Sequence, residues 1–223
     1  MENKKSMEHA YGGSPELVRR VANWENCSIP FSKEFGWERW SLLLLGDCVL
    51  NYIQGDIVEI GVCESSIFFT KMARKYGRKV YHCDLQQSVV ADCLAVDGYF
   101  DEEKNSIYVG TSDDFFKETK FTPIALGFID GGHLYDQVKK DFESLFELIV
   151  SNGFIFIHDL LPPSEEYLVE TRCGDGYLLR KELEKRGDID ILTFPFTAWN
   201  AGFTVIRKLP KNQPYYLESG RKE

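Results

Sequence analysis

Short apolar runs alternate with segments of helical spacing along most of the chain after Gly55. The runs with the length and composition of strands are, in chain order, DIVEIG, KVYHCD, SIYVG, TPIALGFID and FIFIHD. Helical segments such as SIFFTKMARKYG and LYDQVKKDFESLFELIV separate them, and Asn152 and Gly153 are expected to end the second one. The apolar stripe of that helix comprises Leu134, Val138, Phe142, Leu145 and Ile149. This alternation predicts a parallel sheet with helices on both faces.

The end of the chain has a different pattern. A helix is expected from about residue 176 to 186, and two β-rich runs, DIDILTFPF and AGFTVIRK, follow it closely. A short connection between two such runs predicts a β-hairpin. We therefore predict an α/β fold whose mostly parallel, seven-stranded sheet closes with a C-terminal antiparallel hairpin.

The segment before the sheet has its own organisation. Residues 1–13 are polar and are expected to form a flexible leader, and two apolar-periodic stretches between residues 15 and 53 predict helices. We assign residues 1–54 as a leader with helices that form a cap or lid, 55–210 as the main domain, and 211–223 as a polar tail.

Composition narrows the class of protein. A chain of 223 residues with 43% hydrophobic and 27% charged residues is expected to form one globular domain. The net charge of -9 argues against a nucleic-acid partner, because binding to phosphates depends on clustered Lys and Arg. The chain has no apolar export signal or membrane span and no CxxC pair among its six cysteines. These features predict a cytoplasmic protein with reduced thiols, no membrane partner and no zinc site.

Two strand ends carry the residue types of a nucleotide site. Gly61 ends the first strand, and Asp84 ends the second, 23 residues later, at a spacing that suits a carboxylate bound to ribose hydroxyls. The spacing fits either a dinucleotide or an adenosyl ligand. A G-x-G-x-x-G loop would admit a pyrophosphate, but Cys63 and Ser66 replace its later glycines. Ser65 and Ser66 are expected to cap the next helix and to present donors to a ligand.

The chain resembles the class I S-adenosylmethionine-dependent methyltransferases over roughly residues 55–208. The resemblance rests on the VEIGV turn, the acidic end of the second strand and the terminal hairpin. Three further motifs support it: GTSDDF, FIDGGHLYDQVKKDFE and GFIFIHDL. It is strongest to small-molecule O-methyltransferases of the macrocin O-methyltransferase type, which modify sugars. The resemblance implies a Rossmann-like sheet and an S-adenosylmethionine cofactor.

The same resemblance implies where the cofactor would bind. Glu59 and Gly61 would lie against its methionine part, Asp84 would hold the ribose, and Ser112 and Asp113 would flank the adenine. The full set of predicted cofactor-binding residues is Glu59, Gly61, Val62, Ser65, Ser66, Asp84, Ser112, Asp113 and Asp130.

A second group of residues suggests the chemistry. Methyl transfer to oxygen needs an aligned acceptor and removal of its proton, so a base or a metal is expected. The fourth and fifth strands end in Asp130 and His158-Asp159, and we predict that these three residues bind a divalent metal, with Mg²⁺ favoured by the carboxylates. His158 would either ligate a softer metal or support a neighbour. Relatives place a catalytic base at the position of His133, so His133 and Asp130 are the predicted catalytic residues.

These features predict a metal-assisted O-methyltransferase that acts on a hydroxyl of a small molecule such as a sugar. The acceptor would contact the loop 161–174, the N-terminal helices and residues 197–200, with Tyr135, Glu165 and Trp199 as candidates. The resemblance further suggests a homo-oligomer. Two alternatives stay open: an NAD-dependent oxidoreductase on a similar sheet, and a non-catalytic S-adenosylmethionine-binding protein.

Overall fold

The computed structural model describes residues 37–62, 65–87, 103–195 and 201–211. The predicted leader, the first predicted N-terminal helix and nearly all of the polar tail lie outside these residues. So do Cys63 and Trp199.

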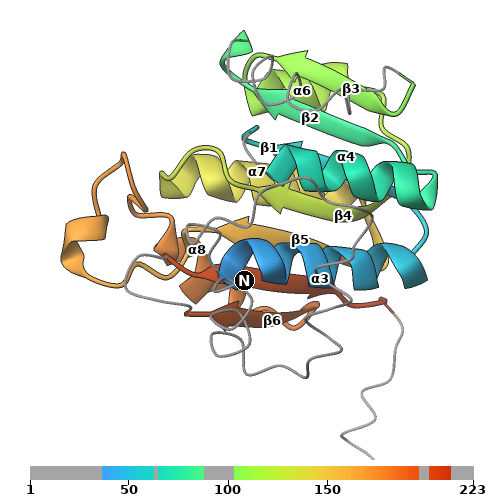
Figure 1. The fold of residues 1–223 in the computed structure, drawn as a ribbon. Coiled ribbons are helices and arrows are strands. Elements are labelled where there is room, and N and C mark those ends of the chain that lie inside the picture. Colours follow the sequence, from blue (N-terminus) through green and yellow to red (C-terminus); the bar gives the residue numbers. More distant parts are fainter. Residues whose placement is uncertain (1–36, 63–64, 88–102, 196–200, 212–223) are drawn as a thin grey trace, which may run out of the picture. The chain divides into compact units, whose positions relative to one another are not determined.

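The protein is built on a seven-stranded sheet (Figure 1). Its strands are β1 (Asp56–Ile60), β2 (Val80–Asp84), β3 (Asn105–Val109), β4 (Ile124–Ile129), β5 (Ile149–His158), β6 (Ile189–Phe194) and β7 (Phe203–Lys208). They lie in the order β3-β2-β1-β4-β5-β7-β6. The first five strands are parallel, and β7 runs antiparallel to both β5 and β6. The predicted α/β fold, with its antiparallel hairpin at the C-terminus, is confirmed.

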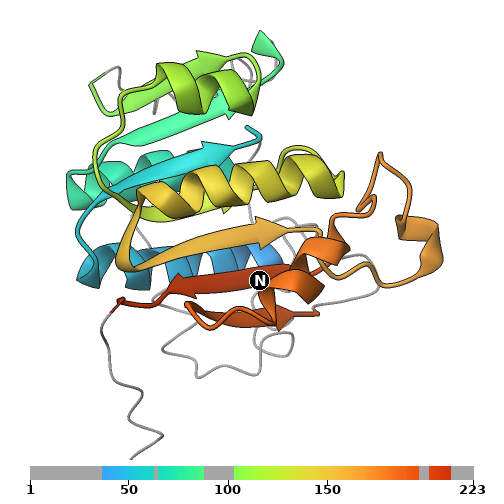
Figure 2. The same cartoon turned by 180° about the vertical axis from the view of Figure 1, so that it is seen from behind.

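Helices cover both faces of the sheet. They are α3 (Trp37–Tyr52), α4 (Ser65–Tyr76), α6 (Ser112–Glu118), α7 (Tyr135–Leu148), the 3-10 helix η3 (Glu165–Tyr167) and α8 (Tyr177–Leu183). Helices α3 and α4 pack on one face (Figure 1), and α6, α7 and α8 lie on the other (Figure 2). None of these helices is long and apolar enough to cross a membrane.

The core explains why the central strands have unbroken apolar runs. Strands β1 and β4 lie in the middle of the sheet, and all six residues of β4 are buried because helices cover both of its faces. Helix α7 packs on β4 and β5 through Val138, Phe142 and Leu145, all of them buried. Burial of each such side chain contributes about 1.5–3 kcal/mol. The strands thus form a rigid base for the loops at their carboxyl ends.

The end of α7 differs from the prediction. The apolar stripe placed Ile149 in the helix, whereas α7 ends at Leu148 and Ile149 begins β5, with an extended backbone (φ -65°, ψ 129°). The pairing of β5 with β4 then shifts register between Ile149 and Phe154. Asn152, expected to end the helix, has a φ of 65° within this irregular part of the strand. A buried β-branched residue fits both periodicities, and pairing with β4 decides in favour of the strand.

Candidate active site

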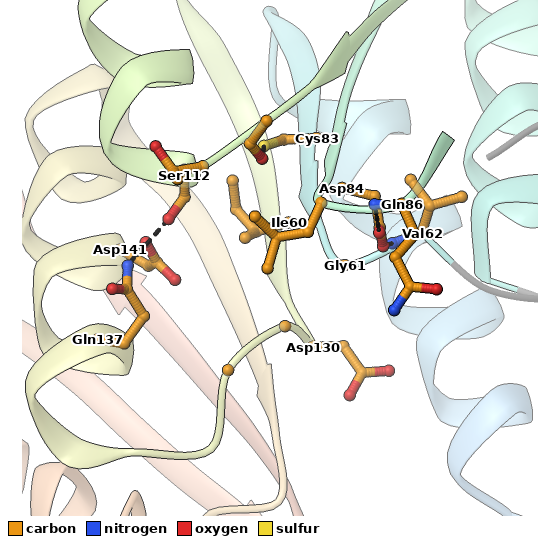
Figure 3. Close-up of a pocket in the computed structure, with 15 residues that line it drawn as sticks. Ile60, Gly61, Val62, Cys83, Asp84, Gln86, Ser112, Asp130, Gln137 and Asp141 are labelled. Carbon is orange, nitrogen blue, oxygen red and sulfur yellow. Dashed lines mark hydrogen bonds between the residues drawn. The ribbon is translucent and has the colours of Figure 1, made fainter. Parts of the chain in front are cut away.

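A cavity of about 370 Å³ opens at the carboxyl ends of β1, β2 and β4, where ligands of open parallel sheets bind (Figure 3). Its lining residues come from the turn after β1, the end of β2, the start of α6 and the first turns of α7. They are Ile60, Gly61, Val62, Cys83, Asp84, Leu85, Gln86, Gly110, Thr111, Ser112, Asp130, Gly131, Gly132, Gln137 and Asp141.

Gly61 brings the ends of two strands into close contact. Its φ of 88° is in the left-handed region, and a Cβ there would collide with the backbone of Asp130 and Gly131. The Gly61 N–H donates to the Cys83 carbonyl (2.9 Å), and the Asp130 N–H donates to the Ile60 carbonyl (2.8 Å). Only glycine fits this position, which leaves the backbone of the turn directly accessible from the cavity.

The Asp84 carboxylate is held by the backbone on either side of it. One oxygen accepts from the Val62 N–H (2.9 Å) and the other from the Gln86 N–H (2.8 Å). Each carboxylate oxygen accepts more than one hydrogen bond. Asp84 is therefore oriented in the cavity and can receive the hydroxyl groups of a ligand.

Glu59 lies beneath the cavity. Its side chain is fully buried and accepts hydrogen bonds from the hydroxyls of Ser65 (2.5 Å) and Ser66 (2.6 Å). His82 of β2, the register partner of Glu59, places its Nδ1 2.6 Å from the same carboxylate. Glu59, Ser65 and Ser66 are three of the predicted cofactor-binding residues, but they do not line the cavity. They support the turn that does.

The network of buried polar side chains around Glu59 extends beyond His82. His82 Nε2 lies 3.0 Å from Asn105 Oδ1, and the Thr70 hydroxyl donates to the same oxygen (3.0 Å). Both ring nitrogens of His82 thus lie next to side-chain oxygens of buried residues. This network was not predicted from the sequence, although a polar His in an otherwise apolar strand run was a signal for it.

The α6–α7 side of the cavity is lined differently from the prediction. Ser112 lines it as expected, but Asp113 does not, and its carboxylate lies 3.7 Å from Lys140 Nζ. Gln137 and Asp141 line it instead. Burial raises the pKa of Asp141, and hydrogen bonds from Ser112 and Gln137 oppose that shift.

A cluster of carboxylates and imidazoles adjoins the cavity. Asp130, His133 and Asp159 each offer a donor atom, and these atoms lie within 4.8 Å of one another. His133 Nε2 is 3.2 Å from Asp159 Oδ2. His158 Nδ1 lies 3.0 Å from Asp130 Oδ1 and 3.0 Å from Asp159 Oδ1, so this nitrogen is close to both carboxylates. The four residues predicted at the two strand ends are thus brought together, and Asp130 also lines the cavity.

The chain orients His133 and Asp159. His133 Nδ1 lies 3.1 Å from the Glu170 carbonyl, which can only accept, so Nε2 is the nitrogen directed at the carboxylates. Asp159 has an uncommon φ of 62° and donates its N–H to the Gly202 carbonyl (3.1 Å). The hydrogen bond to Asp159 raises the pKa of His133. Burial alone would raise the pKa of Asp159, but hydrogen bonds from His133 and His158 lower it to about 2.

The donor set of this cluster suits a divalent cation. Carboxylate oxygens are ligands that Mg²⁺ prefers, and an imidazole nitrogen extends the set to Mn²⁺, Fe²⁺ or Zn²⁺. The side chains are partly exposed, from 15% for Asp159 to 25% for His133, so a ligand can approach them. The residues present therefore fit a cation.

The structure describes two of the three candidate acceptor contacts. The Tyr135 hydroxyl donates to Glu182 (2.5 Å), where Lys139 also donates (2.6 Å), and this bond joins α7 to α8. Glu165 is exposed in η3, on the segment after β5. Trp199 lies outside the described residues.

Solved structures of methyltransferases share this fold. An O-methyltransferase from Bacillus cereus, in complex with SAH, has a TM-score of 0.65 at 12% identity over 92% of this chain and 96% of its own. TomG, an O-methyltransferase from Streptomyces achromogenes involved in tomaymycin synthesis, in complex with SAM, has 0.63 at 15% identity over 87% and 89%. The SAH-bound methyltransferase PaMTH1 from Podospora anserina has 0.62 at 17% identity over 94% of both chains. The comparison with curated proteins found no match.

The sheet order places this chain in the Rossmann-like fold that these methyltransferases share. The sequence agrees, since residues 58–160 match the family model described as a methyltransferase domain. That stretch contains Gly61, Asp84, Asp130 and Asp159. The resemblance to S-adenosylmethionine-dependent methyltransferases is thereby confirmed.

Proposed function

We propose that the protein transfers the methyl group of S-adenosylmethionine to a hydroxyl oxygen of a small molecule, with the assistance of a divalent cation. The observation that carries this proposal is the position of Asp130. Its side chain belongs both to the nucleotide-type cavity and to the cluster of His133, His158 and Asp159. A methyl donor in the cavity and an acceptor at the cluster would therefore be neighbours.

Different residues of the cavity would contact different parts of the cofactor. Asp84, already oriented by two backbone N–H groups, would accept from the ribose hydroxyls. The open backbone at Gly61 and Val62 would face the methionine part, and Ser112 the adenine. Glu59, Ser65 and Ser66 would act indirectly, because their hydrogen bonds hold the turn in place. When bound, S-adenosylmethionine supplies an electrophilic methyl group on a sulfonium.

The cluster would hold the acceptor and accept its proton. Asp130 and Asp159 would hold the cation, which polarises a hydroxyl and lowers its pKa. His158 would keep the two carboxylates in position through its Nδ1. The Glu170 carbonyl orients the His133 ring so that its Nε2 faces the Asp159 carboxylate. This nitrogen would take the proton of the acceptor hydroxyl.

The chemistry of the cluster supports a polar, oxygen-rich acceptor such as a sugar. Hydroxyl oxygens are ligands of the kind that Mg²⁺ prefers. The segment after β5 that contacts His133 is acidic, with Glu165, Glu166 and Glu170, and favours neutral or cationic acceptors over anionic ones. Two of the three structural relatives named above are O-methyltransferases, which agrees with transfer to oxygen.

Ligand-dependent melting tests the cofactor first. S-adenosylhomocysteine is expected to raise the melting temperature by mass action, and NAD is not. A rise with NAD alone would contradict the proposal and favour the oxidoreductase.

Turnover tests the chemistry. Formation of S-adenosylhomocysteine is measured with a panel of sugars and glycosylated metabolites, with and without EDTA. His133→Ala is expected to abolish turnover and keep the affinities for cofactor and Mg²⁺, both measured by calorimetry. Asp136→Asn, an exposed change in the first turn of α7, is the control and should keep turnover. Unchanged turnover in His133→Ala would remove the base role, and lost Mg²⁺ affinity would make His133 a ligand instead.

A further inference from the structure

The α6–α7 wall of the cavity has a buried carboxylate to which the mechanism above gives no role. Asp141 is only 1% exposed, yet it lines the cavity from the inner face of α7. Figure 3 shows it beside Ser112 and Gln137, across the cavity from Asp84 and Val62. A carboxylate buried in a cofactor cavity is costly unless it is hydrogen-bonded or meets a ligand donor.

The neighbours of Asp141 orient its carboxylate and leave its oxygens able to accept further hydrogen bonds. The Gln137 amide nitrogen donates to Asp141 Oδ1 (3.0 Å) and to the Ser112 hydroxyl oxygen (2.9 Å), which uses both hydrogens of that amide. Asp141 also has a hydrogen bond with Ser112. Two carboxylate oxygens accept about four hydrogen bonds. This wall therefore presents oxygen acceptors to the cavity.

The position of this wall identifies the part of the ligand that would meet it. This step rests on the proposed function, which places the methionine part at Gly61 and the ribose at Asp84. On the wall opposite Asp84, the polar lining residues are Ser112, Gln137 and Asp141, and these are left for the base. Gly131 and Gly132 also line the cavity and add no side chain to block access. Asp113, the acidic residue that the sequence favoured here, lies beside Lys140 instead.

We infer that Asp141 is a specificity-determining residue that accepts a hydrogen bond from the 6-amino group of the cofactor's adenine. An adenine presents an N–H donor at that position, whereas a hypoxanthine presents a carbonyl oxygen. A carboxylate attracts the first and repels the second. Sites that hydrogen-bond a ligand group discriminate strongly against analogues without it, because the buried partner loses its hydrogen bond.

The test compares two ligands that differ only at this position. S-adenosylhomocysteine and S-inosylhomocysteine are titrated into the full chain by calorimetry, and the ratio of their dissociation constants is measured. The wild type is expected to prefer the adenosyl ligand by about tenfold or more. Asp141→Asn keeps the shape of the side chain but adds a donor, so the ratio is expected to fall at least about tenfold.

Two further variants make the result specific. Asp113→Asn removes a nearby carboxylate that does not line the cavity, and it should leave the ratio unchanged. Gln137→Leu removes the amide that orients Asp141 and should lower the ratio of the two dissociation constants. This variant replaces Asp141→Asn in the test if Asp141→Asn does not fold. A wild type that binds both ligands equally would overturn the inference and spare the proposed function. Binding of neither ligand would overturn both. An unchanged ratio in folded Asp141→Asn, or an equal fall in Asp113→Asn, would also overturn the inference.

Discussion

Removal of His82 is expected to destabilise the protein strongly, because its ring contacts the buried Glu59 carboxylate. Their side chains are both 0% exposed, and His82 Nδ1 lies 2.6 Å from Glu59 Oε2. In His82→Leu, the Glu59 carboxylate would keep the hydroxyls of Ser65 and Ser66 but lose its contact with the imidazole. Asn105 would lose one donor as well.

The size of the effect follows from burial. Loss of one partner from a buried polar contact costs about 1–3 kcal/mol, and more where the group left behind is charged. A small domain has a total stability of only about 5–15 kcal/mol. The Lys75–Asp47 pair is a matched control, because its distance is also 2.6 Å but its side chains are 28% and 30% exposed. Lys75→Met is expected to cost under about 1 kcal/mol.

Urea unfolding followed by circular dichroism measures both variants against the wild type. His82→Leu should lower the free energy of unfolding by several times as much as Lys75→Met. The double variant Glu59→Leu/His82→Leu should be less destabilised than the sum of its single changes, since it removes both partners of the contact. A loss in His82→Leu no greater than that in Lys75→Met would refute the reasoning, as would simple additivity in the double variant.

Three further predictions concern the residues that line the cavity. Gly61→Ala combines a positive φ with a backbone collision, so it should destabilise the protein by more than the control Gly77→Ala. Gly77 has a positive φ (64°) but no atom near the added Cβ, and its substitution should cost about 1 kcal/mol. Equal melting temperatures of the two variants would contradict this prediction. Asp84→Asn should weaken S-adenosylhomocysteine about tenfold or more by calorimetry, and unchanged affinity would show that the ribose lies elsewhere. Burial raises the pKa of the Cys83 thiol to about 12, so at pH 8 it stays protonated. Peptide mapping after iodoacetamide should find exposed Cys48 alkylated and Cys83 intact, and comparable labelling would contradict the burial.

Much of the fold could be predicted because local patterns determine it. Apolar runs in alternation with helical segments define a parallel sheet, and two β-rich runs close together define a hairpin. Parallel strands have their carboxyl ends at one edge, so strand-end residues such as Asp84, Asp130 and Asp159 were expected to gather there. The sheet order confirms this arrangement.

The tertiary structure alone decided which polar side chain at a strand end faces the ligand. Glu59 faces His82 because the register of β1 and β2 pairs them on one side of the sheet. Asp113 points to Lys140, and Asp141, two turns into α7, replaces it in the cavity. Ile149 left the helix because a strand partner was available. Sequence periodicity describes one element at a time, whereas the direction of a polar side chain depends on packing between elements distant in the chain.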